Sequence, residues 1–323
     1  MISVTIAICT RDRPERLQSL LGSLVRLAAP VDAEWDLLIV DNGCRHGTRE
    51  VARHYAGSLP IRLIHEPRPG LSVARNRALE MASGAWVIFT DDDVTVSPTW
   101  LANHVDAFRA NPAAAFFGGP IHAEIGGIAD ERRAIYREVV PGALVHLEPE
   151  FGSRCLWRTG WGFPWGANIA FRRDALGNLR FDPRLGRKPG GGFQIGEETR
   201  LIEALLENGQ FGIWLPDNRV IHHTDRSRLR RRYLRRFYYQ VGWLMGERIA
   251  QSDPAEEIST VQAAQDRLGL RRRIGLHFLE PLPVRFARLR DRSIDRGLLD
   301  ALAAARQSCA QDLTARGQES FHV

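Results

Sequence analysis

The run from Trp86 to Val94 constrains the fold more than any other stretch, because apolar and β-branched residues lead directly into three consecutive aspartates. An uninterrupted apolar run of this length is typical of a strand buried on both faces, as in a parallel sheet. Asp91, Asp92 and Asp93 would then lie at the carboxyl end of that strand, where open α/β sheets bind their ligands. Adjacent carboxylates repel one another unless a cation lies among them. The run therefore indicates a divalent-metal site with oxygen ligands or, as the simpler alternative, a solvated acidic turn.

The chain before this run repeats the arrangement of an apolar strand that ends in polar residues. Strands are expected at residues 4–9, 35–40, 61–65 and 86–90, with helical patterns between them. Such alternation is typical of βαβ units in a parallel sheet, in which the carboxyl ends of all strands lie along one edge. The polar residues expected along that edge are Thr10, Arg11, Asp41, Glu66 and the three aspartates. This concentration of polar groups predicts a ligand site.

The glycine motifs of the common nucleotide-binding folds are missing. The sequence has neither G-x-G-x-x-G after its first strand nor G-x-x-x-x-G-K-[ST] anywhere, which argues against a Rossmann dehydrogenase and a P-loop enzyme. A nucleotide bound at this edge would therefore need a metal ion on the aspartates to neutralise its phosphates.

Four short segments, in a fixed order, are similar to those of a known family. They are Thr10-Arg11-Asp12-Arg13-Pro14, Val40-Asp41-Asn42-Gly43, the segment 70–76 and Asp91-x-Asp93. Together they resemble the family 2 glycosyltransferases, whose GT-A fold is an α/β, Rossmann-like fold with a mainly parallel central sheet. The resemblance implies a nucleotide-sugar-binding half at 1–118 and an acceptor-binding and catalytic half at 119–225. The remainder, 226–323, is expected to be a basic, helical C-terminal tail.

The resemblance also implies a donor site. Its nucleotide-binding residues would be Thr10, Arg11, Asp41, Arg75, Asp91 and Asp92, and its metal ligands Asp91, Asp93 and His222. Asp41 would contact the base, and Arg75 the base or the diphosphate. The metal would be Mg²⁺ or Mn²⁺, the donor most simply a UDP-sugar, and the acceptor a carbohydrate, lipid-linked or other hydroxyl compound.

Glu197 and Glu198 follow Gly196 at the start of a helical pattern. Carboxylates are favoured there by the helix dipole, so the pair can be explained without any chemistry. By resemblance, however, Glu198 takes the place of the catalytic base of an inverting glycosyltransferase. Glu197 would then lie beside the sugar of the acceptor or donor.

Trp157, Trp161 and Trp165 recur at intervals of four, which in a helix would form a core stripe. The glycines and the proline between them make a helix implausible, so an irregular loop is expected. We therefore predict that Trp161 and Trp165 contact a sugar, since a flat apolar face can stack on one. Asn168 belongs to a segment that, by resemblance, lies beside the donor sugar.

Seven of the eleven residues 226–236 are arginine, within a chain of net charge +6. The pattern predicts an amphipathic helix whose apolar face consists of Leu229, Tyr233, Phe237, Val241 and Leu244. Three explanations are compatible with this pattern: a helix that docks on the protein, attachment to an anionic membrane, and nucleic-acid binding. Docking with some membrane affinity is favoured, and nucleic acid is unlikely because no recognised motif accompanies the arginines.

The expected location is cytoplasmic, with a peripheral position at the inner membrane face as a further hypothesis. No stretch approaches the ~20 apolar residues of a membrane span, and the first apolar run is too short for a signal peptide. Two rival functions also fit part of the sequence. Asp91-x-Asp93-Val94-Thr95 also fits a haloacid-dehalogenase-like phosphatase, although that motif belongs on a first strand. The second rival is a non-catalytic, basic binding protein that acts through its arginine helix.

Overall fold

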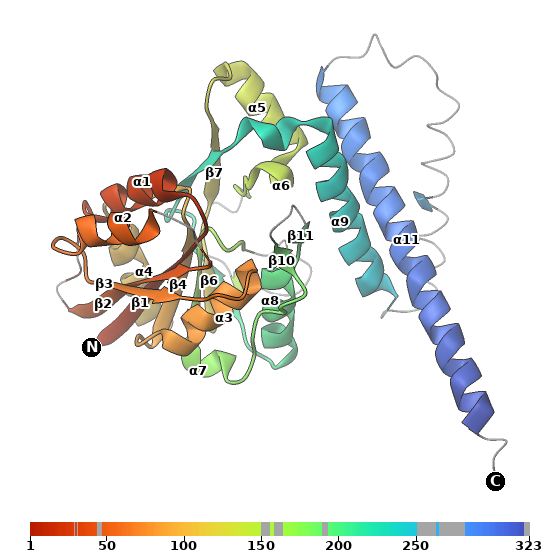
Figure 1. The fold of residues 1–323 in the computed structure, drawn as a ribbon, viewed down its shortest axis with the longest axis horizontal. Helices are drawn as coiled ribbons and strands as arrows, with labels where there is room; N and C mark the ends of the chain where they lie inside the picture. Colours follow the sequence, from red (N-terminus) through yellow and green to blue (C-terminus); the bar gives the residue numbers. More distant parts are fainter. Residues whose placement is uncertain are drawn as a thin grey trace. The chain divides into compact units, whose positions relative to one another are not determined.

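The computed structural model describes residues 1–28, 30, 32–43, 47–149, 156–157, 164–188, 193–250, 263–264 and 282–319. The chain forms two compact units (Figure 1). Unit 1 comprises Met1–Gly127 and Val145–Asp225, and unit 2 comprises Ile128–Leu144 and Arg226–Val323. The predicted division of residues 1–225 into a donor half and an acceptor half stays a prediction.

Unit 1 is built on an eight-stranded sheet in the order β3-β2-β1-β4-β9-β6-β12-β8. Its strands are β1 (Ile2–Thr10), β2 (Ala33–Asp41), β3 (Ile61–His65), β4 (Trp86–Asp91), β6 (Phe116–Gly118), β8 (Leu156–Trp157), β9 (Ile169–Arg172) and β12 (Gly212–Trp214). The first four strands in this order are parallel, whereas β9 is antiparallel to both β4 and β6. The predicted α/β fold with a mainly parallel sheet is confirmed.

The register of the parallel strands aligns the residues predicted to share one edge. Cys9 pairs with Asp91, Thr10 with Asp41, and Asp41 with His65. The carboxyl ends of β3, β2, β1 and β4 therefore lie next to one another in the sheet.

Helices cover both faces of this sheet (Figure 1). α1 (Pro14–Leu24), α2 (Thr48–Tyr55) and α4 (Trp100–Ala110) pack on one face, and α3 (Leu71–Met81), α7 (Arg173–Leu176) and α8 (Glu197–Glu207) on the other. Successive residues of β4 enter opposite cores: Trp86 and Ile88 join the first cluster, and Val87 and Phe89 the second. This alternation explains why the run before the aspartates is continuously apolar.

A three-stranded sheet continues from the aspartates, in the order β5-β13-β7. It comprises β5 (Val94–Val96), β7 (Ile121–Ile125) and β13 (Val220–Thr224). β13 is antiparallel to β5 and places His222 opposite Val94, directly after Asp93 in the sequence. A short hairpin, β10 (Gly186–Arg187) and β11 (Phe193–Gln194), completes the described strands of this unit.

Unit 2 is helical. Its described elements are α5 (Asp130–Val139), α6 (Pro141–Leu144), the 3-10 helix η2 (Arg226–Leu229), α9 (Arg231–Ile249) and α11 (Leu282–Glu319). α9 and α11 lie side by side and run in the same direction (Figure 1). None of the helices described here is both long and apolar enough to cross a membrane.

The predicted apolar face of the arginine helix is wrong. The residues of α9 that are buried are Leu234, Tyr238, Gly242 and Gly246, a face rotated by one residue from the expected one. A Cβ atom on Gly242 would meet the backbone oxygen of Ile294 in α11. Glycine at this position lets the two helices approach closely, so the contact face follows the small residues and not the largest apolar ones.

Candidate active site

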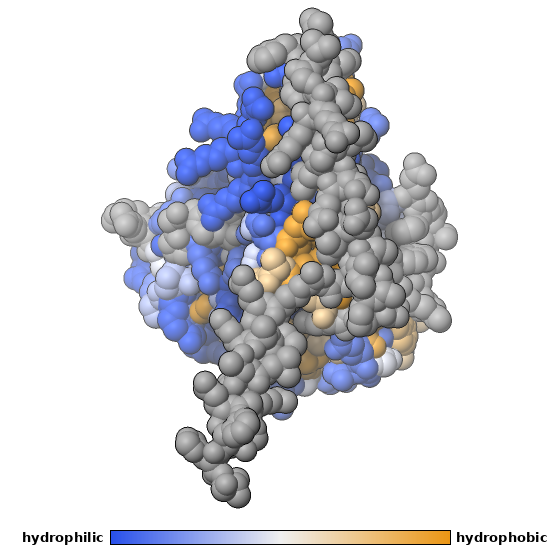
Figure 2. Space-filling model, turned by 90° about the vertical axis from the view of Figure 1, so that its right-hand side faces the viewer, coloured by the Kyte–Doolittle hydropathy of each residue, from blue (hydrophilic) through white to orange (hydrophobic). Residues whose placement is uncertain are grey.

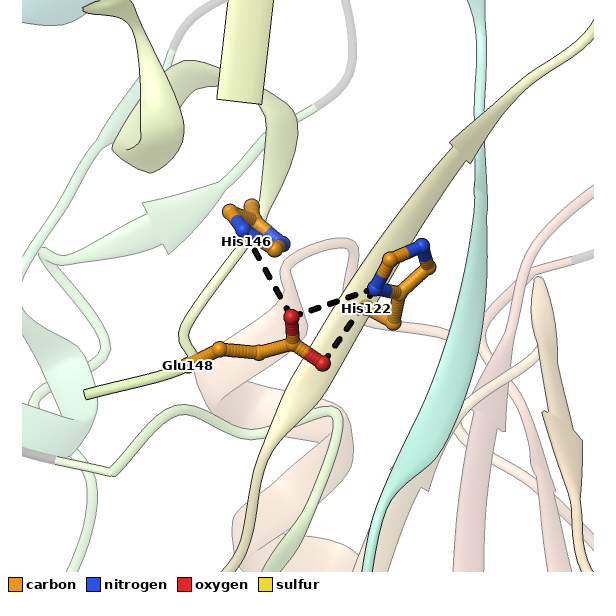
Figure 3. Close-up of side chains that lie close together, drawn as sticks. All are labelled: His122, His146 and Glu148. Atoms are coloured by element: carbon orange, nitrogen blue, oxygen red, sulfur yellow. Dashed lines mark hydrogen bonds and ion pairs between the residues drawn. The ribbon is translucent and has the colours of Figure 1, made fainter. Parts of the chain in front are cut away.

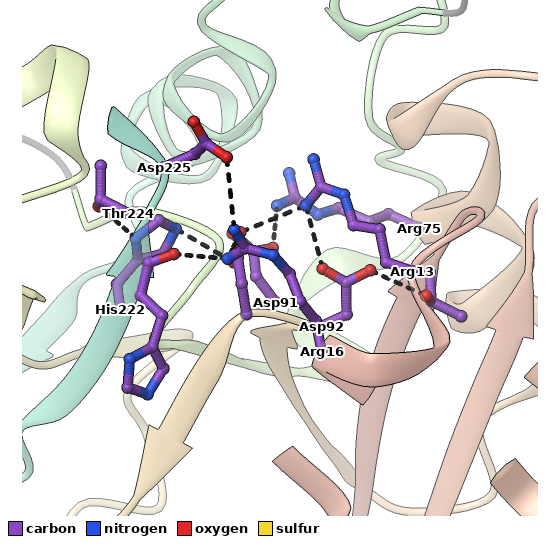
Figure 4. A network of polar contacts seen from close by, with 11 residues as sticks. Arg13, Arg16, Arg75, Asp91, Asp92, His222, Thr224 and Asp225 are labelled. Atoms are coloured by element: carbon purple, nitrogen blue, oxygen red, sulfur yellow. Dashed lines mark hydrogen bonds and ion pairs between the residues drawn. The ribbon is translucent and has the colours of Figure 1, made fainter. Parts of the chain in front are cut away.

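Asp91 is the last residue of β4, and Asp92 and Asp93 form the turn to β5. Figure 4 labels Asp91 and Asp92. Asp92 and Asp93 are buried, with 5% and 6% of their surface exposed, whereas Asp91 is partly exposed. The solvated acidic turn, the simpler alternative, is therefore wrong for Asp92 and Asp93. Buried carboxylates need charged or hydrogen-bonding partners, and the neighbouring elements supply them.

Two arginines from the start of α1 contact these acids. Arg13 Nη1 lies 3.2 Å from Asp92 Oδ1 and 3.2 Å from Asp93 Oδ2. Arg16 Nη1 lies 3.5 Å from Asp93 Oδ2 and donates to the backbone oxygen of His223 at 2.6 Å. Sequence reasoning gave neither arginine a role. Their sequence positions could have indicated one. Arg13 and Arg16 are three residues apart at the start of the helix that follows β1, so both side chains lie on one helical face at the predicted edge of the sheet.

Asp92 connects β1 to β4. Its Oδ2 accepts a hydrogen bond from Thr10 Oγ1 at 2.8 Å. Burial raises the pKa of Asp92 to about 6, and the charge of Asp93 adds to this, while Arg13 and Thr10 act in the opposite direction. In this structure Thr10 and Asp92 hold the turn, and their predicted contact with the nucleotide stays a prediction.

Asp91, Asp93 and His222 come together as the resemblance implied. One ligand atom from each lies within 4.8 Å of the others. His222 Nε2 is 3.1 Å from Asp93 Oδ1, and its Nδ1 is 2.8 Å from Thr224 Oγ1. Although His222 is fully buried, its Nε2 makes no hydrogen bond of acceptable geometry to any described residue. A buried nitrogen of this kind beside two carboxylates fits a divalent metal ion, for which carboxylates and imidazole are both suitable ligands.

Arg75 of α3 joins the aspartates to the glutamates. Its Nη1 lies 2.8 Å from Glu198 Oε1 and 3.0 Å from Glu197 Oε1, and its Nη2 lies 3.5 Å from Asp91 Oδ1. The guanidinium is only 3% exposed and lies over the ring of Phe181, 5.5 Å from its centroid. Burial alone would lower the pKa of Arg75, but the three carboxylates raise it above its ordinary value. Arg75 is therefore a permanent buried cation.

Glu197 and Glu198 begin α8, as predicted, after Gly196 in a left-handed conformation with φ +104°. Glu198 Oε1 also accepts the backbone N–H of Gly166 at 2.9 Å. Burial alone would raise the pKa of Glu198, but Arg75 and the backbone hydrogen bonds hold it below its ordinary value. Burial, together with the charge of Glu198, raises the pKa of Glu197. Glu198 is thus the member of the pair that keeps its negative charge.

The segment that carries Gly166 is anchored by Asn168. This side chain is fully buried, and its Nδ2 donates to the backbone oxygens of Pro120 at 3.1 Å and Asn218 at 2.7 Å. Its Oδ1 accepts a hydrogen bond from Trp100 Nε1 at 3.1 Å. Asn168 therefore fixes the backbone of this segment through buried hydrogen bonds. Its contact with a sugar stays a prediction.

The other predicted residues differ in their surroundings. Trp165 is partly buried and packs against the hydrophobic core, while Trp161 lies outside the described residues. Asp41 is 17% exposed, with its Oδ2 3.7 Å from His65 Nδ1. Arg11 is 38% exposed, yet its Nη1 is buried and has no hydrogen-bond partner in the part of the chain described here.

Asn42 was missed as a structural residue of the site. Its Nδ2 donates to the backbone oxygens of Glu66 and Arg68 at 3.2 and 2.8 Å, and its Oδ1 accepts the backbone N–H of Gly70 at 2.9 Å. Asn42 thereby holds the loop that leads into α3 and so helps to place Arg75. The only available signal was its position after Asp41 at the end of a strand.

Comparison with known families assigns this arrangement to a class. Residues 5–180, more than half of the chain, match the model described as glycosyl transferase family 2. The chain therefore belongs to glycosyltransferase family 2. The phosphatase and non-catalytic alternatives are wrong, and β4 is indeed preceded by three strands of the same sheet.

Two curated relatives are similar to about the same share of the chain. The chain is 29% identical over 247 residues to the succinoglycan biosynthesis protein ExoM of Rhizobium meliloti, covering 71% of this chain and 75% of that protein. It is 25% identical over 236 residues to the glucosyl-dolichyl phosphate glucuronosyltransferase of Haloferax volcanii, covering 68% and 69% respectively.

Solved structures confirm the GT-A fold. The mannosyltransferase PcManGT from Pyrobaculum calidifontis, in complex with GDP-Man and Mn²⁺, matches 98% of this chain and 79% of its own, with 19% identity and a TM-score of 0.53. Residues 1–349 of S. aureus TarS, in complex with UDP-GlcNAc, match 96% of this chain and 92% of their own, with 14% identity and a TM-score of 0.55. At these identities the likeness concerns the fold alone.

Proposed function

We propose that this glycosyltransferase moves a sugar from a nucleotide-diphosphate donor to a hydroxyl group with inversion at the anomeric carbon, and that it needs a divalent metal. The observation that carries the proposal is Arg75, one guanidinium that contacts Asp91 on one side and Glu198 on the other. Donor-binding and proton-accepting groups are thereby held together at one site.

The donor end of the site is supported by its ligand set. Asp91, Asp93 and His222 would hold Mg²⁺ or Mn²⁺, and Arg13 and Arg16 already contribute positive charge beside the same acids. When bound, such an ion stabilises the negative charge of a departing diphosphate. A UDP-sugar is the first choice of donor, and the fold relatives in complex with UDP-GlcNAc and GDP-Man define the two bases to compare.

The acceptor end depends on Glu198. The hydrogen bonds from Arg75 and Gly166 both reach Oε1, so we assign Oε2 as the oxygen that takes the proton from the acceptor hydroxyl. Because Arg75 holds Glu198 ionised, the base is ready before the acceptor arrives. Arg75 and the Gly166 N–H keep the carboxylate in a single orientation while the proton moves.

The exposed arginines of the chain's basic helix support one class of acceptor over another. Arg230, Arg231, Arg235 and Arg236 are all exposed. Among the residues coloured in Figure 2, hydrophilic ones are drawn in blue and hydrophobic ones in orange. Exposed arginines favour anionic lipid headgroups. A lipid-linked acceptor at an anionic membrane surface is therefore the hypothesis to test first, with free carbohydrate as the alternative.

A thermal-shift screen of UDP- and GDP-sugars, each with Mn²⁺ and with a chelator, tests the proposal. A ligand at 100 times its dissociation constant stabilises the folded state by about 2.7 kcal/mol, which is readily measured. We expect one nucleotide series to stabilise the protein, and only with the metal present. Stabilisation that the chelator does not alter would contradict metal dependence, and no stabilisation by any nucleotide sugar would contradict the donor class.

A further inference from the structure

A second group of metal-ligating side chains lies on the opposite face of the three-stranded sheet. Ile121 of β7 and Leu147 form an antiparallel bridge. The Ile121 nitrogen lies 2.8 Å from the Leu147 oxygen, and the Leu147 nitrogen lies 2.9 Å from the Ile121 oxygen. Both of these side chains pack into the core. Because side chains alternate across an extended strand, the neighbours His122, His146 and Glu148 lie together on the other face (Figure 3).

The three side chains have the spacing of a metal-binding set. His122 Nδ1 lies 3.2 Å from each carboxylate oxygen of Glu148, and His146 Nε2 lies 3.9 Å from Glu148 Oε2. One ligand atom from each lies within 4.8 Å of the others. A tetrahedral zinc ion with bonds of 2.0–2.1 Å needs ligand atoms about 3.3 Å apart. The ring of His146 must therefore rotate toward Glu148 and release the long, 3.4 Å contact in which its Nδ1 accepts the Ala123 backbone N–H. The side chains are 14–27% exposed, which lets an ion reach them from solvent.

This group is separate from the candidate active site. In the parallel pairing of β7 with β13, Ala123 stands beside His222, and both are fully buried. One residue earlier, His122 stands beside Ile221, which is 40% exposed. His122 and His222 therefore point to opposite faces of the same sheet.

Arg219 is the competing cation. Its Nε lies 2.7 Å from Glu148 Oε1, and its side chain is 60% exposed. An exposed arginine can move into water at little cost, because surface ion pairs contribute little to stability. Arg219 thus contacts Glu148 Oε1, whereas His146 Nε2 lies 3.9 Å from the other oxygen, Oε2.

We propose that His122, His146 and Glu148 bind a divalent transition-metal ion of the zinc type. Two imidazoles and one carboxylate form a three-ligand set that leaves a fourth position for water. One ligand comes from β7 and two from the adjoining segment, so the ion fixes residues 146–148 to the edge of the sheet. The bound state is therefore more resistant to unfolding than the metal-free one.

Calorimetric titration of the metal-free full chain with Zn²⁺ tests this site. We expect His122→Gln and His146→Gln each to abolish the binding of one equivalent of Zn²⁺ or to weaken it strongly. Loss of a residue that only hydrogen-bonds to a metal ligand typically weakens metal affinity by roughly 10–100-fold, so loss of a true ligand should weaken it by more than that. Asp93→Asn, at the other site, should retain this equivalent. The exposed His54→Gln is the matched control and should bind as the wild type does.

Arg219→Gln keeps all three ligands and removes their competitor, so it provides a test even if a histidine variant fails to fold. Tighter Zn²⁺ binding and a larger zinc-induced rise in melting temperature are expected. Unchanged or weaker binding in Arg219→Gln would overturn the proposal. Identical zinc stoichiometry in the wild type and in folded His122→Gln and His146→Gln would overturn it too.

Discussion

Gly166 donates its backbone N–H to Glu198 Oε1 over 2.9 Å, so a loop with no side chain at this point orients the proposed base. A Cβ atom on Gly166 would meet both Arg75 and Glu198. The backbone lies so close to the ion pair of Arg75 and Glu198 that only glycine fits at position 166.

The first prediction concerns this contact. Gly166→Ala should displace the guanidinium of Arg75 or the carboxylate of Glu198, costing about 1–3 kcal/mol in unfolding free energy from overpacking. The sugar-transfer rate should fall by more than the decrease in the folded fraction of the protein explains. Gly57→Ala is the control, because a Cβ atom there meets nothing within 4 Å. Initial rates and denaturant unfolding measured on both variants check this, and a fully active Gly166→Ala would contradict the role of the loop.

The second prediction separates catalysis from binding. Glu198→Gln retains the shape of the side chain and removes its basicity, so the transfer rate should fall by about 10²–10⁴ while donor affinity changes little. Glu197→Gln should lose much less, since burial already favours the protonated form of Glu197. Single-turnover rates and calorimetric donor affinities measure the two effects. If Glu197→Gln is the inactive variant, the assignment of the base is wrong by one residue.

The third prediction concerns the metal. Asp93→Ala should lower the affinity for nucleoside diphosphate as strongly as a chelator does in the wild type. The chelator should then have no further effect on the variant. Calorimetry with the diphosphate alone measures this without any need for the acceptor. Equal affinity in the wild type, with and without chelator, would remove the metal from the mechanism.

The fourth prediction concerns pH and His104, a fully buried residue of α4 between Trp100 and Phe108. Burial lowers the pKa of His104 to about 3, and the neighbouring Asn168 offsets this only in part. Below its ordinary pKa of 6.5 the unfolded chain takes up a proton that the folded chain does not. The stability that His104 provides is thus complete above pH 6.5 and is lost as the pH falls below it. By pH 5 the loss should reach about 2 kcal/mol.

His104→Phe should remove this loss, because phenylalanine does not titrate and suits the aromatic surroundings. Denaturant unfolding of the wild type and the variant at pH 7 and pH 5 gives the difference. The exposed His54→Gln serves as the control and should resemble the wild type. If the unfolding free energy of His104→Phe decreases between pH 7 and pH 5 as much as that of the wild type, other groups cause the loss of stability in acid.

The fifth prediction concerns the exposed arginines of the basic helix and the residue before it. Replacing Arg230, Arg231, Arg235 and Arg236 by Gln should weaken sedimentation with anionic liposomes, since each basic residue contributes about 1 kcal/mol near such a surface. Donor affinity should stay the same. Failure of the wild type to sediment at low salt would exclude membrane attachment and leave helix packing as the role of α9.

The sequence was most informative where periodicity and chain order decide the structure. The apolar run before Asp91 predicted a doubly buried strand, and parallel topology then predicted that Thr10, Asp41 and Asp91 share an edge. The family resemblance implied one metal site for Asp91, Asp93 and His222, and one ligand atom from each lies within 4.8 Å of the others, while metal binding itself stays a prediction. These inferences need no knowledge of side-chain packing.

Side-chain partners could not be predicted in the same way. The contacts of Arg75 with Glu197 and Glu198 span more than 120 residues and depend on how α3 and α8 pack on one face of the sheet. The buried face of α9 was missed for a related reason. Helical periodicity identifies the most apolar stripe, whereas Gly242 and Gly246 allow the closest approach of α11.

The shared guanidinium of Arg75 also has a consequence for the proposed site, because it contacts both Asp91 and Glu198. A donor complex that draws Asp91 away from Arg75 leaves more of its positive charge for Glu198, and this alters the proton affinity of the base. Thermodynamic linkage is reciprocal, so protonation of Glu198 must change donor affinity by the same factor. Donor binding and the protonation state of Glu198 are therefore expected to be coupled through this one side chain.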